Sequence, residues 1–194
     1  LSVLTVSADE RSAEILDKLS NIISNSGNYR IDFISTVEGH SMEGYYIVSG
    51  ENYRIHTPEM DIFCADGISY QIDGINKEIV IEPAPEADKG DILSDPIHAF
   101  SFLDEDYNHS FVRQAEQGDK TCLVIRLEGK TNRQNIQLYI DAKTSLPVRA
   151  EYFLENINSE AVIEVKGFTP RIEKTDIVPD MKRYEYYEII DFRQ

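Results

Sequence analysis

Residues 61–81 read DIFCADGISYQIDGINKEIVI, and this stretch decides the fold. Apolar and polar side chains alternate around two Asp-Gly pairs, at 66–67 and 73–74. A period of two is typical of a strand with one buried face, and Asp-Gly between two such runs is a strong hairpin signal. The stretch therefore predicts three successive antiparallel strands.

The same alternation continues in both directions along the chain. Turn residues recur with short connections, which is typical of a meandering antiparallel sheet and argues against βαβ units. A sheet of about ten or eleven strands curls, so the predicted fold is mainly β with helices, a half-open antiparallel barrel around one core. The further predicted strands are 29–33, 45–47, 53–55, 110–114, 122–127, 135–141, 146–153, 161–168 and a final edge strand within 184–190.

An amphipathic helix is predicted before the first strand. Ser7 and Glu10 have the spacing of a capping box, and Asn25-Ser26-Gly27 ends the pattern. The apolar residues with helical spacing are Ile15, Leu16, Leu19, Ile22 and Ile23.

The strand pattern stops in the middle of the chain. Residues 83–91 are rich in Pro, Gly and charge, and 92–103 are apolar without alternation, with Pro96 placed for the first turn of a short helix. We expect one or two short helices over 92–103 that act as a lid on the sheet, with 83–91 as its hinge.

Charge and hydropathy exclude several classes of partner. The formal net charge is −16, from 35 acidic and 19 basic residues. Such a field repels phosphate, which disfavours nucleic acid and anionic membrane surfaces. No stretch approaches the roughly 18 to 20 consecutive apolar residues of a membrane-spanning helix.

The first eight residues, LSVLTVSA, are apolar and small and precede the charged run Asp9-Glu10-Arg11. A stretch that closes on a small-x-small site is typical of the end of a secretory signal. This predicts a signal-peptide remnant at 1–8, one domain over 9–194, and export to the periplasm of a Gram-negative-type cell. The alternative for 1–8 is an ordinary strand.

Cys64 and Cys122 are the two cysteines, and they are too far apart for a CxxC motif. The two cysteines could form one disulfide in an oxidising compartment. The favoured interpretation is two small buried side chains on strands.

The sequence predicts no enzyme and no metal or nucleotide cofactor. The four histidines lie far apart, and none belongs to a zinc-binding HExxH motif. Residues 104–108 begin like an EF-hand loop, but His109 stands where that loop requires glycine. No glycine-rich phosphate loop is present either.

The concave face of the curled sheet collects one parity of apolar side chains, and these are the candidate ligand site. Each side chain of this kind that is hidden from water contributes about 1.5 to 3 kcal/mol, so the face must be covered. The alternative is a sealed core in which the helices fill the space completely. The candidate lipid-binding residues are Tyr29, Ile31, Phe33, Tyr45, Ile47, Tyr53, Ile55 and Tyr70 on the sheet, with Ile92, Leu93, Ile97, Phe100, Phe102 and Leu103 on the lid.

The order of elements and several local motifs resemble the LolA-type lipoprotein carriers and their lipid-binding relatives. The resemblance covers nearly the whole chain and depends on the order of the motifs. The matching pieces are Ile15-Leu16-Asp17-Lys18-Leu19-Ser20, Tyr29-Arg30-Ile31-Asp32-Phe33, Glu43-Gly44-Tyr45-Tyr46-Ile47, Asn52-Tyr53-Arg54-Ile55, residues 65–73, Asp95-Pro96, Ile140-Asp141, Leu146-Pro147 and residues 188–193.

The resemblance implies a monomeric periplasmic carrier that holds lipoprotein acyl chains, or a related lipid, under a helical lid. It implies handover from an inner-membrane release complex to an outer-membrane acceptor, without catalysis or cofactor. One departure stands out, because proteobacterial carriers have a basic latch residue after the second strand and this chain has Ser49-Gly50 there. The alternative on the same fold is a protein-interaction or sensor module with a self-filled core.

Overall fold

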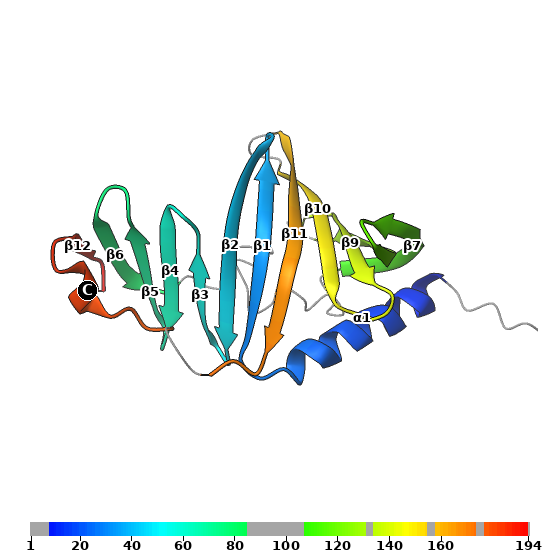
Figure 1. Cartoon of the computed structure of the whole chain (residues 1–194), viewed down its shortest axis with the longest axis horizontal. Coiled ribbons are helices and arrows are strands. Elements are labelled where there is room, and N and C mark those ends of the chain that lie inside the picture. Colours follow the sequence, from blue (N-terminus) through cyan, green and yellow to red (C-terminus); the bar gives the residue numbers. More distant parts are fainter. Residues whose placement is uncertain (1–7, 85–106, 131–133, 155–157, 174–176, 194) are drawn as a thin grey trace, which may run out of the picture. The chain divides into compact units, whose positions relative to one another are not determined.

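The structure of the chain is a computed structural model that describes residues 8–84, 107–130, 134–154, 158–173 and 177–193 (Figure 1). Residues 1–7 of the predicted signal-peptide remnant lie outside the described residues. So does the whole of the predicted lid, 92–103.

One amphipathic helix, α1 (Ala8–Ser24), opens the described chain, as predicted. Leu16 and Leu19 on its apolar stripe are fully buried. The helix ends where Asn25 donates from its backbone and from its side chain to the carbonyl oxygen of Asn21. Gly27 follows in the left-handed region, a conformation that glycine adopts without steric cost.

The strands form one sheet with the order β12-β6-β5-β4-β3-β2-β1-β11-β10-β9-β8-β7, which confirms the predicted mainly β class. The sheet has twelve strands, against the ten or eleven expected. The strands are β1 (Tyr29–Val37), β2 (His40–Ser49), β3 (Asn52–His56), β4 (Met60–Ala65), β5 (Ile68–Asp73), β6 (Glu78–Pro83), β7 (Tyr107–Gln117), β8 (Lys120–Gly129), β9 (Ile136–Asp141), β10 (Pro147–Leu154), β11 (Ser159–Pro170) and β12 (Glu188–Asp191).

The two Asp-Gly pairs make hairpins of different kinds. Asp66 and Gly67 both have positive φ, the conformation of a two-residue hairpin turn between β4 and β5. The second hairpin has a longer loop, because Asp73 pairs with Glu78 and its carboxylate accepts from the backbone N–H groups of the loop.

The end of the chain differs from the prediction. A 3-10 helix, η1 (Met181–Tyr184), occupies the start of the predicted edge strand, and the strand itself is shorter and begins at Glu188. The strand β12 pairs in parallel with β6, so the expectation of a purely antiparallel sheet is wrong at this position. A tight hairpin turn cannot join a parallel pair, and β6 and β12 are far apart in the chain, with β7 to β11 between them.

The chain divides into two compact units. The first holds α1, β7 to β10 and residues 159–165 of β11. The second holds residues 29–35 of β1, most of β2, all of β3 to β6, the end of β11 and residues 177–193. The prediction of a single domain over 9–194 stays a prediction.

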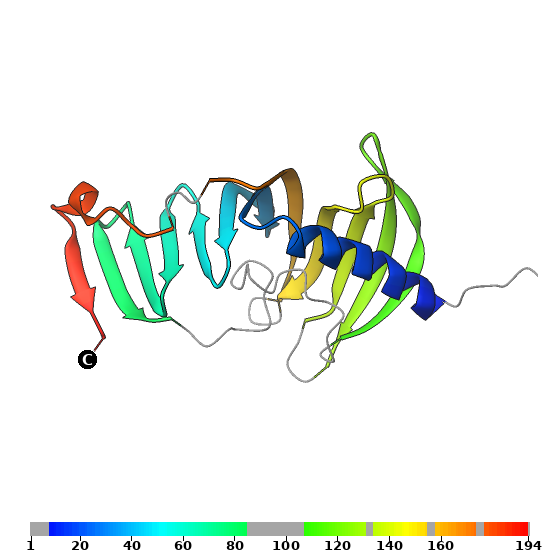
Figure 2. The ribbon, with the colours of Figure 1, turned by 90° about the horizontal axis from the view of Figure 1, so that it is seen from below.

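In the first unit α1 runs across the strands, as Figure 2 shows. Ile125 and Leu138 are register partners on β8 and β9, and both are buried. The intervening Val124 and Tyr139 belong to a buried cluster with Cys122, so both faces of these strands carry apolar side chains.

In the second unit residues 177–187, which we name the crossing segment, run over one face of the sheet. Ile177 packs in a buried cluster with Ile47 and Ala65. Near η1, three side chains of the segment, Met181, Tyr184 and Tyr187, pack against Phe63, Ile72, Ile79 and Ile81. The crossing segment is therefore part of a core of the second unit.

This role of the crossing segment predicts different effects at two adjacent positions. Ile177 is 6% exposed and Val178 is 60% exposed. Ile177→Ala removes buried methylene groups and should lower the free energy of unfolding by about 2 to 5 kcal/mol. Val178→Ala is the matched control and should change it by less than about 0.5 kcal/mol. Urea denaturation measures both values, and equal effects would contradict the packing of the segment.

Candidate functional site

The pairing register divides β2 to β5 of the second unit into two faces. Residues directly opposite in a sheet point to the same side, and neighbours in a strand point to opposite sides. On one face Tyr45 pairs with His56, and Arg54 pairs with Phe63. On the other face Tyr46 pairs with Ile55.

The first face lies under the crossing segment, and we name it the covered face. Three of the predicted site residues, Tyr45, Ile47 and Tyr70, lie there. Tyr45 packs against the cluster of Ile47 and Ile177, and Tyr70 against the cluster that holds Met181 and Tyr184. The structure therefore places these three away from the other five predicted sheet residues.

The opposite side, which we name the aromatic face, collects the other five. Tyr29 and Phe33 contact the ring of Tyr46 at centroid distances of 6.5 and 6.2 Å. Phe168 of β11 adds a fourth ring, 5.8 Å from Tyr29. The aromatic face consists of Tyr29, Ile31, Phe33, Tyr46, Tyr53 and Ile55, all of them buried.

Tyr46 is the member of this face that sequence reasoning missed. The sequence has two adjacent tyrosines at 45 and 46, and alternation alone does not say which of them faces a ligand. Among the buried side-chain polar atoms of the described residues, the Tyr46 hydroxyl is the one that has no hydrogen-bond partner. Burial, and then the neighbouring Tyr29, raise the pKa of Tyr46 well above its ordinary value, so the phenol stays neutral and can donate.

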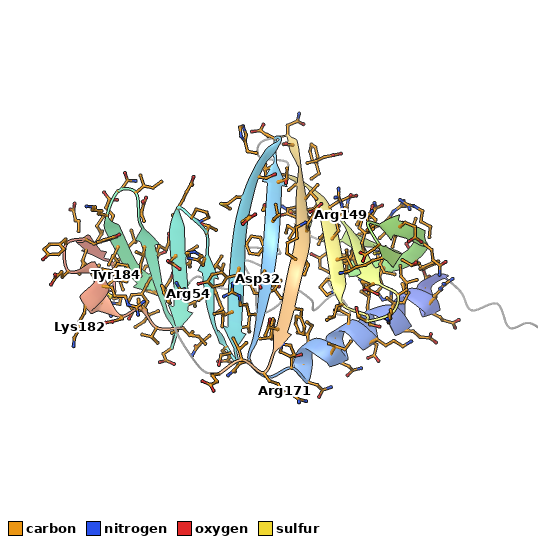
Figure 3. All side chains as sticks on the ribbon, viewed as in Figure 1. Asp32, Arg54, Arg149, Arg171, Lys182 and Tyr184 are labelled. Carbon is orange, nitrogen blue, oxygen red and sulfur yellow. The ribbon has the colours of Figure 1, made fainter. Side chains whose placement is uncertain are left out.

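Ion pairs of β1, β3 and β4 lie on the covered face. Arg30 pairs with Asp32 and stacks 3.8 Å from the Tyr45 ring centroid. Arg54 donates twice to Asp61, at 2.9 and 2.8 Å. Figure 3 shows Asp32 and Arg54 on their strands. The aromatic face thus offers rings, aliphatic side chains and one unused hydroxyl.

Gly44 allows the rings to pack closely. A Cβ atom at this position would lie 2.7 Å from the carbonyl oxygen of His56 and 2.7 Å from Cζ of Phe33. Real Cβ atoms do not approach so closely, and the His56 contact is with backbone. Gly44 therefore lets Phe33 lie across β2 beside Tyr46.

Two grooves of the first unit suit an apolar chain poorly. One, of about 440 Å³, is lined by Arg126, Gln137, Arg149 and Glu151 among others. The Arg149 guanidinium is already used, because it donates to Glu151 at 2.7 Å and to Glu164 at 3.2 Å. A smaller groove, of about 360 Å³, lies beside His109.

The contact between Ser12 and His109 looks at first like a nucleophile and a base. The Oγ to Nδ1 distance is 2.8 Å, but Ser12 is fully buried and its hydroxyl donates to the carbonyl oxygen of Asp9. The Ser12 hydroxyl already donates its hydrogen bond within α1, so His109 is not placed to take a proton from it. We interpret the pair as a link between α1 and β7. Within the described residues no group of three or more His, Cys, Asp or Glu side chains is placed to hold a metal ion.

Both cysteines are free and buried, one on β4 and one on β8, which confirms the favoured interpretation. Burial raises the pKa of each thiol.

Gly50, at the position expected for a basic latch, has a φ of 63° in the turn between β2 and β3. Backbone conformation explains this glycine. The predicted lid residues Ile92, Leu93, Ile97, Phe100, Phe102 and Leu103 lie outside the described residues.

No protein-family model matches the chain, and no curated protein sequence is significantly similar to it. Among solved structures, the chain is similar to an uncharacterized conserved protein from Thermus thermophilus, with 11% identity, 93% of this chain and 99% of that chain covered, and a TM-score of 0.58. It is also similar to MucB, with 13% identity, 86% and 61% covered, and a TM-score of 0.50.

A LolA superfamily protein from Nitrosomonas europaea is also matched, with 13% identity, 91% of this chain and 96% of that chain covered, and a TM-score of 0.42. At identities of 11% and 13%, the two matches with TM-scores of 0.58 and 0.50 show the fold alone.

The close approach at Gly44 leads to a prediction about the aromatic face. Gly44→Ala should lower the free energy of unfolding by about 1 to 3 kcal/mol, because Phe33 and the His56 carbonyl must shift. Gly74→Ala is the control, since a Cβ atom there would meet its nearest neighbour at an ordinary 3.9 Å. Urea denaturation compares the two, and a harmless Gly44→Ala would contradict the packing described.

Proposed function

We propose that this protein is a periplasmic carrier that binds lipid acyl chains, such as those of lipoproteins, against the aromatic face without catalysis. One observation carries the proposal: an uncharged aromatic face that holds a buried hydroxyl without a partner among the described residues. An unpaired buried hydroxyl costs about 1 to 3 kcal/mol, so a ligand that accepts a hydrogen bond from it is favoured.

An acyl chain fits both properties of this face. Its methylene groups gain about 0.8 kcal/mol each when they leave water, which gives on the order of 10 kcal/mol for a common chain length before ordering costs. Its ester or amide carbonyl accepts a hydrogen bond from a phenol. Tyr46 would thereby fix the head of the chain while Tyr29, Ile31 and Phe33 line its path.

The charge of the protein suits reversible transfer. A net charge of −16 disfavours adsorption to anionic lipid, so contact with lipid would run through the apolar face. Within the described residues no helix has the length and apolar character that a membrane crossing needs. Partners in this scheme are an inner-membrane release complex and an outer-membrane acceptor, with the carrier acting as a monomer and needing no cofactor.

The predicted lid over 92–103 stays a prediction, and the proposal does not depend on it. The alternative is a protein-interaction or sensor module whose aromatic face is filled by its own side chains. The two differ in whether delipidated protein takes up a chain.

Tyr46→Phe separates these two functions. Removal of the unpaired hydroxyl should leave the free energy of unfolding unchanged or raise it by up to about 1 to 2 kcal/mol. The Kd of delipidated protein for a fluorescent fatty acid should rise about 5- to 10-fold, the worth of one neutral hydrogen bond. Tyr186→Phe is the matched control, because Tyr186 is 85% exposed, and it should change neither value.

If the wild-type protein takes up the fatty acid and Tyr46→Phe takes it up equally well, the Tyr46 hydroxyl is not part of the lipid site. No uptake by delipidated wild-type protein would reject the carrier and support the self-filled alternative. Mass spectrometry of lipid extracted from the freshly purified protein identifies the native ligand in the first case.

A further inference from the structure

The strand β12 leaves one backbone edge open within the described part of the chain. It ends the strand order and pairs with β6, and the N–H groups of Glu188 and Phe192 donate to the carbonyl oxygens of Lys77 and Ile81, at 2.9 and 2.7 Å. In a parallel pair alternate residues direct both backbone groups to the same neighbour. The N–H and C=O groups of Ile189 and Asp191 therefore point away from β6.

Apolar side chains accompany this edge. Ile72, Ile79 and Ile189 are consecutive register partners on β5, β6 and β12. The first two are buried, whereas Ile189 is 54% exposed, and the nearby Phe192 is 61% exposed. The buried row of the covered face thus continues into solvent, although natural edge strands commonly avoid exposed apolar side chains.

The opposite face of the same three strands carries an acidic row. Asp73 pairs with Glu78, and Glu78 pairs with Glu188, so three carboxylates lie side by side and run out to the edge. Neither glutamate takes part in an ion pair among the described residues. The guanidinium of Arg193 is held by Asp191 at 2.9 and 2.6 Å, so it does not neutralise the row.

These charges decide which strand can add to the edge. A second copy would bring its own acidic row and a net charge of −16, and like charges opposite one another destabilise a pair of strands. A strand with a basic residue beside Glu188 is attracted to the acidic row instead. Its next residue, on the other face, would lie beside Ile189.

We propose that β12 is a docking edge for an extended, basic segment of a protein partner, which adds as a further strand with Lys or Arg beside Glu188 and an apolar residue beside Ile189. This mode uses main-chain hydrogen bonds for affinity and alternate side chains for specificity. It is independent of the proposed lipid binding, because it uses the sheet edge and not the aromatic face.

The test uses the full chain and a soluble peptide of alternating Lys and Val, with a peptide of alternating Glu and Val for comparison. The Lys peptide should bind and the Glu peptide should not. Glu188→Lys should weaken binding of the Lys peptide about tenfold, from an attractive to a repulsive neighbour. Glu14→Lys changes the net charge equally on an exposed position of α1 and should weaken binding less than about twofold.

The backbone contribution is tested with a pair of variants at one position. Ile189→Pro removes the N–H that points away from β6, and it leaves the backbone hydrogen bonds of Glu188 and Phe192 in place. Ile189→Ala removes the side chain and keeps the N–H. Binding should weaken a few-fold in Ile189→Ala and be lost in Ile189→Pro, with both far-ultraviolet spectra like that of wild type.

Hydrogen exchange gives a readout that does not depend on a variant. The amides of Ile189 and Asp191 should gain protection when the Lys peptide binds, while the amide of Ile190 stays as protected as before. Equal binding of both peptides, or bound Lys peptide without protection at Ile189 and Asp191, would overturn the proposal.

Discussion

The pairing register of β2 to β6 is the constraint on which the second unit depends. A shift of one residue would exchange every side chain between the two faces. Tyr46 would then lie under the crossing segment and Arg54 among the aromatic rings, which would bury a charge in apolar surroundings at high cost. The two-residue turn at Asp66-Gly67 and the close packing at Gly44 both fix this register, one through backbone conformation and the other through space.

This constraint gives the two faces different physical characters. The covered face is completed by the chain itself, through Ile177, Met181, Tyr184 and Tyr187, and its charges are used in ion pairs such as that of Arg54 with Asp61. The aromatic face combines buried rings with a polar atom that nothing in the described residues uses. This difference between the two faces is the reason why the aromatic face, and not the covered face, is proposed as the lipid site.

The strands and the helix could be predicted because their signals are local. Period-two alternation marked several of the strands, short apolar runs between turn residues marked the others up to β11, and helical spacing from Ile15 to Ile23 marked α1. The crossing segment could not be predicted, because its apolar residues follow neither the strand period nor the helix period. Their role becomes visible only from their contacts with the buried side chains of the sheet. The sequence grouped Tyr45, Ile47 and Tyr70 on one face with the other five sheet residues, whereas the register places them on the opposite face, for a related reason. Alternation shows that neighbours diverge, but the hairpin register decides which one faces a ligand.

The most direct test of the account is to locate a bound chain by magnetic resonance. Delipidated protein with a carbon-13 labelled fatty acid should give intermolecular nuclear Overhauser effects from the acyl methylene groups to the rings of Tyr29, Phe33 and Tyr46. No such effects should reach Met181, Tyr184 or Tyr187 under the covered face. Effects to those three side chains, or none to the aromatic face at saturating fatty acid, would contradict the assignment of the aromatic face as the lipid site.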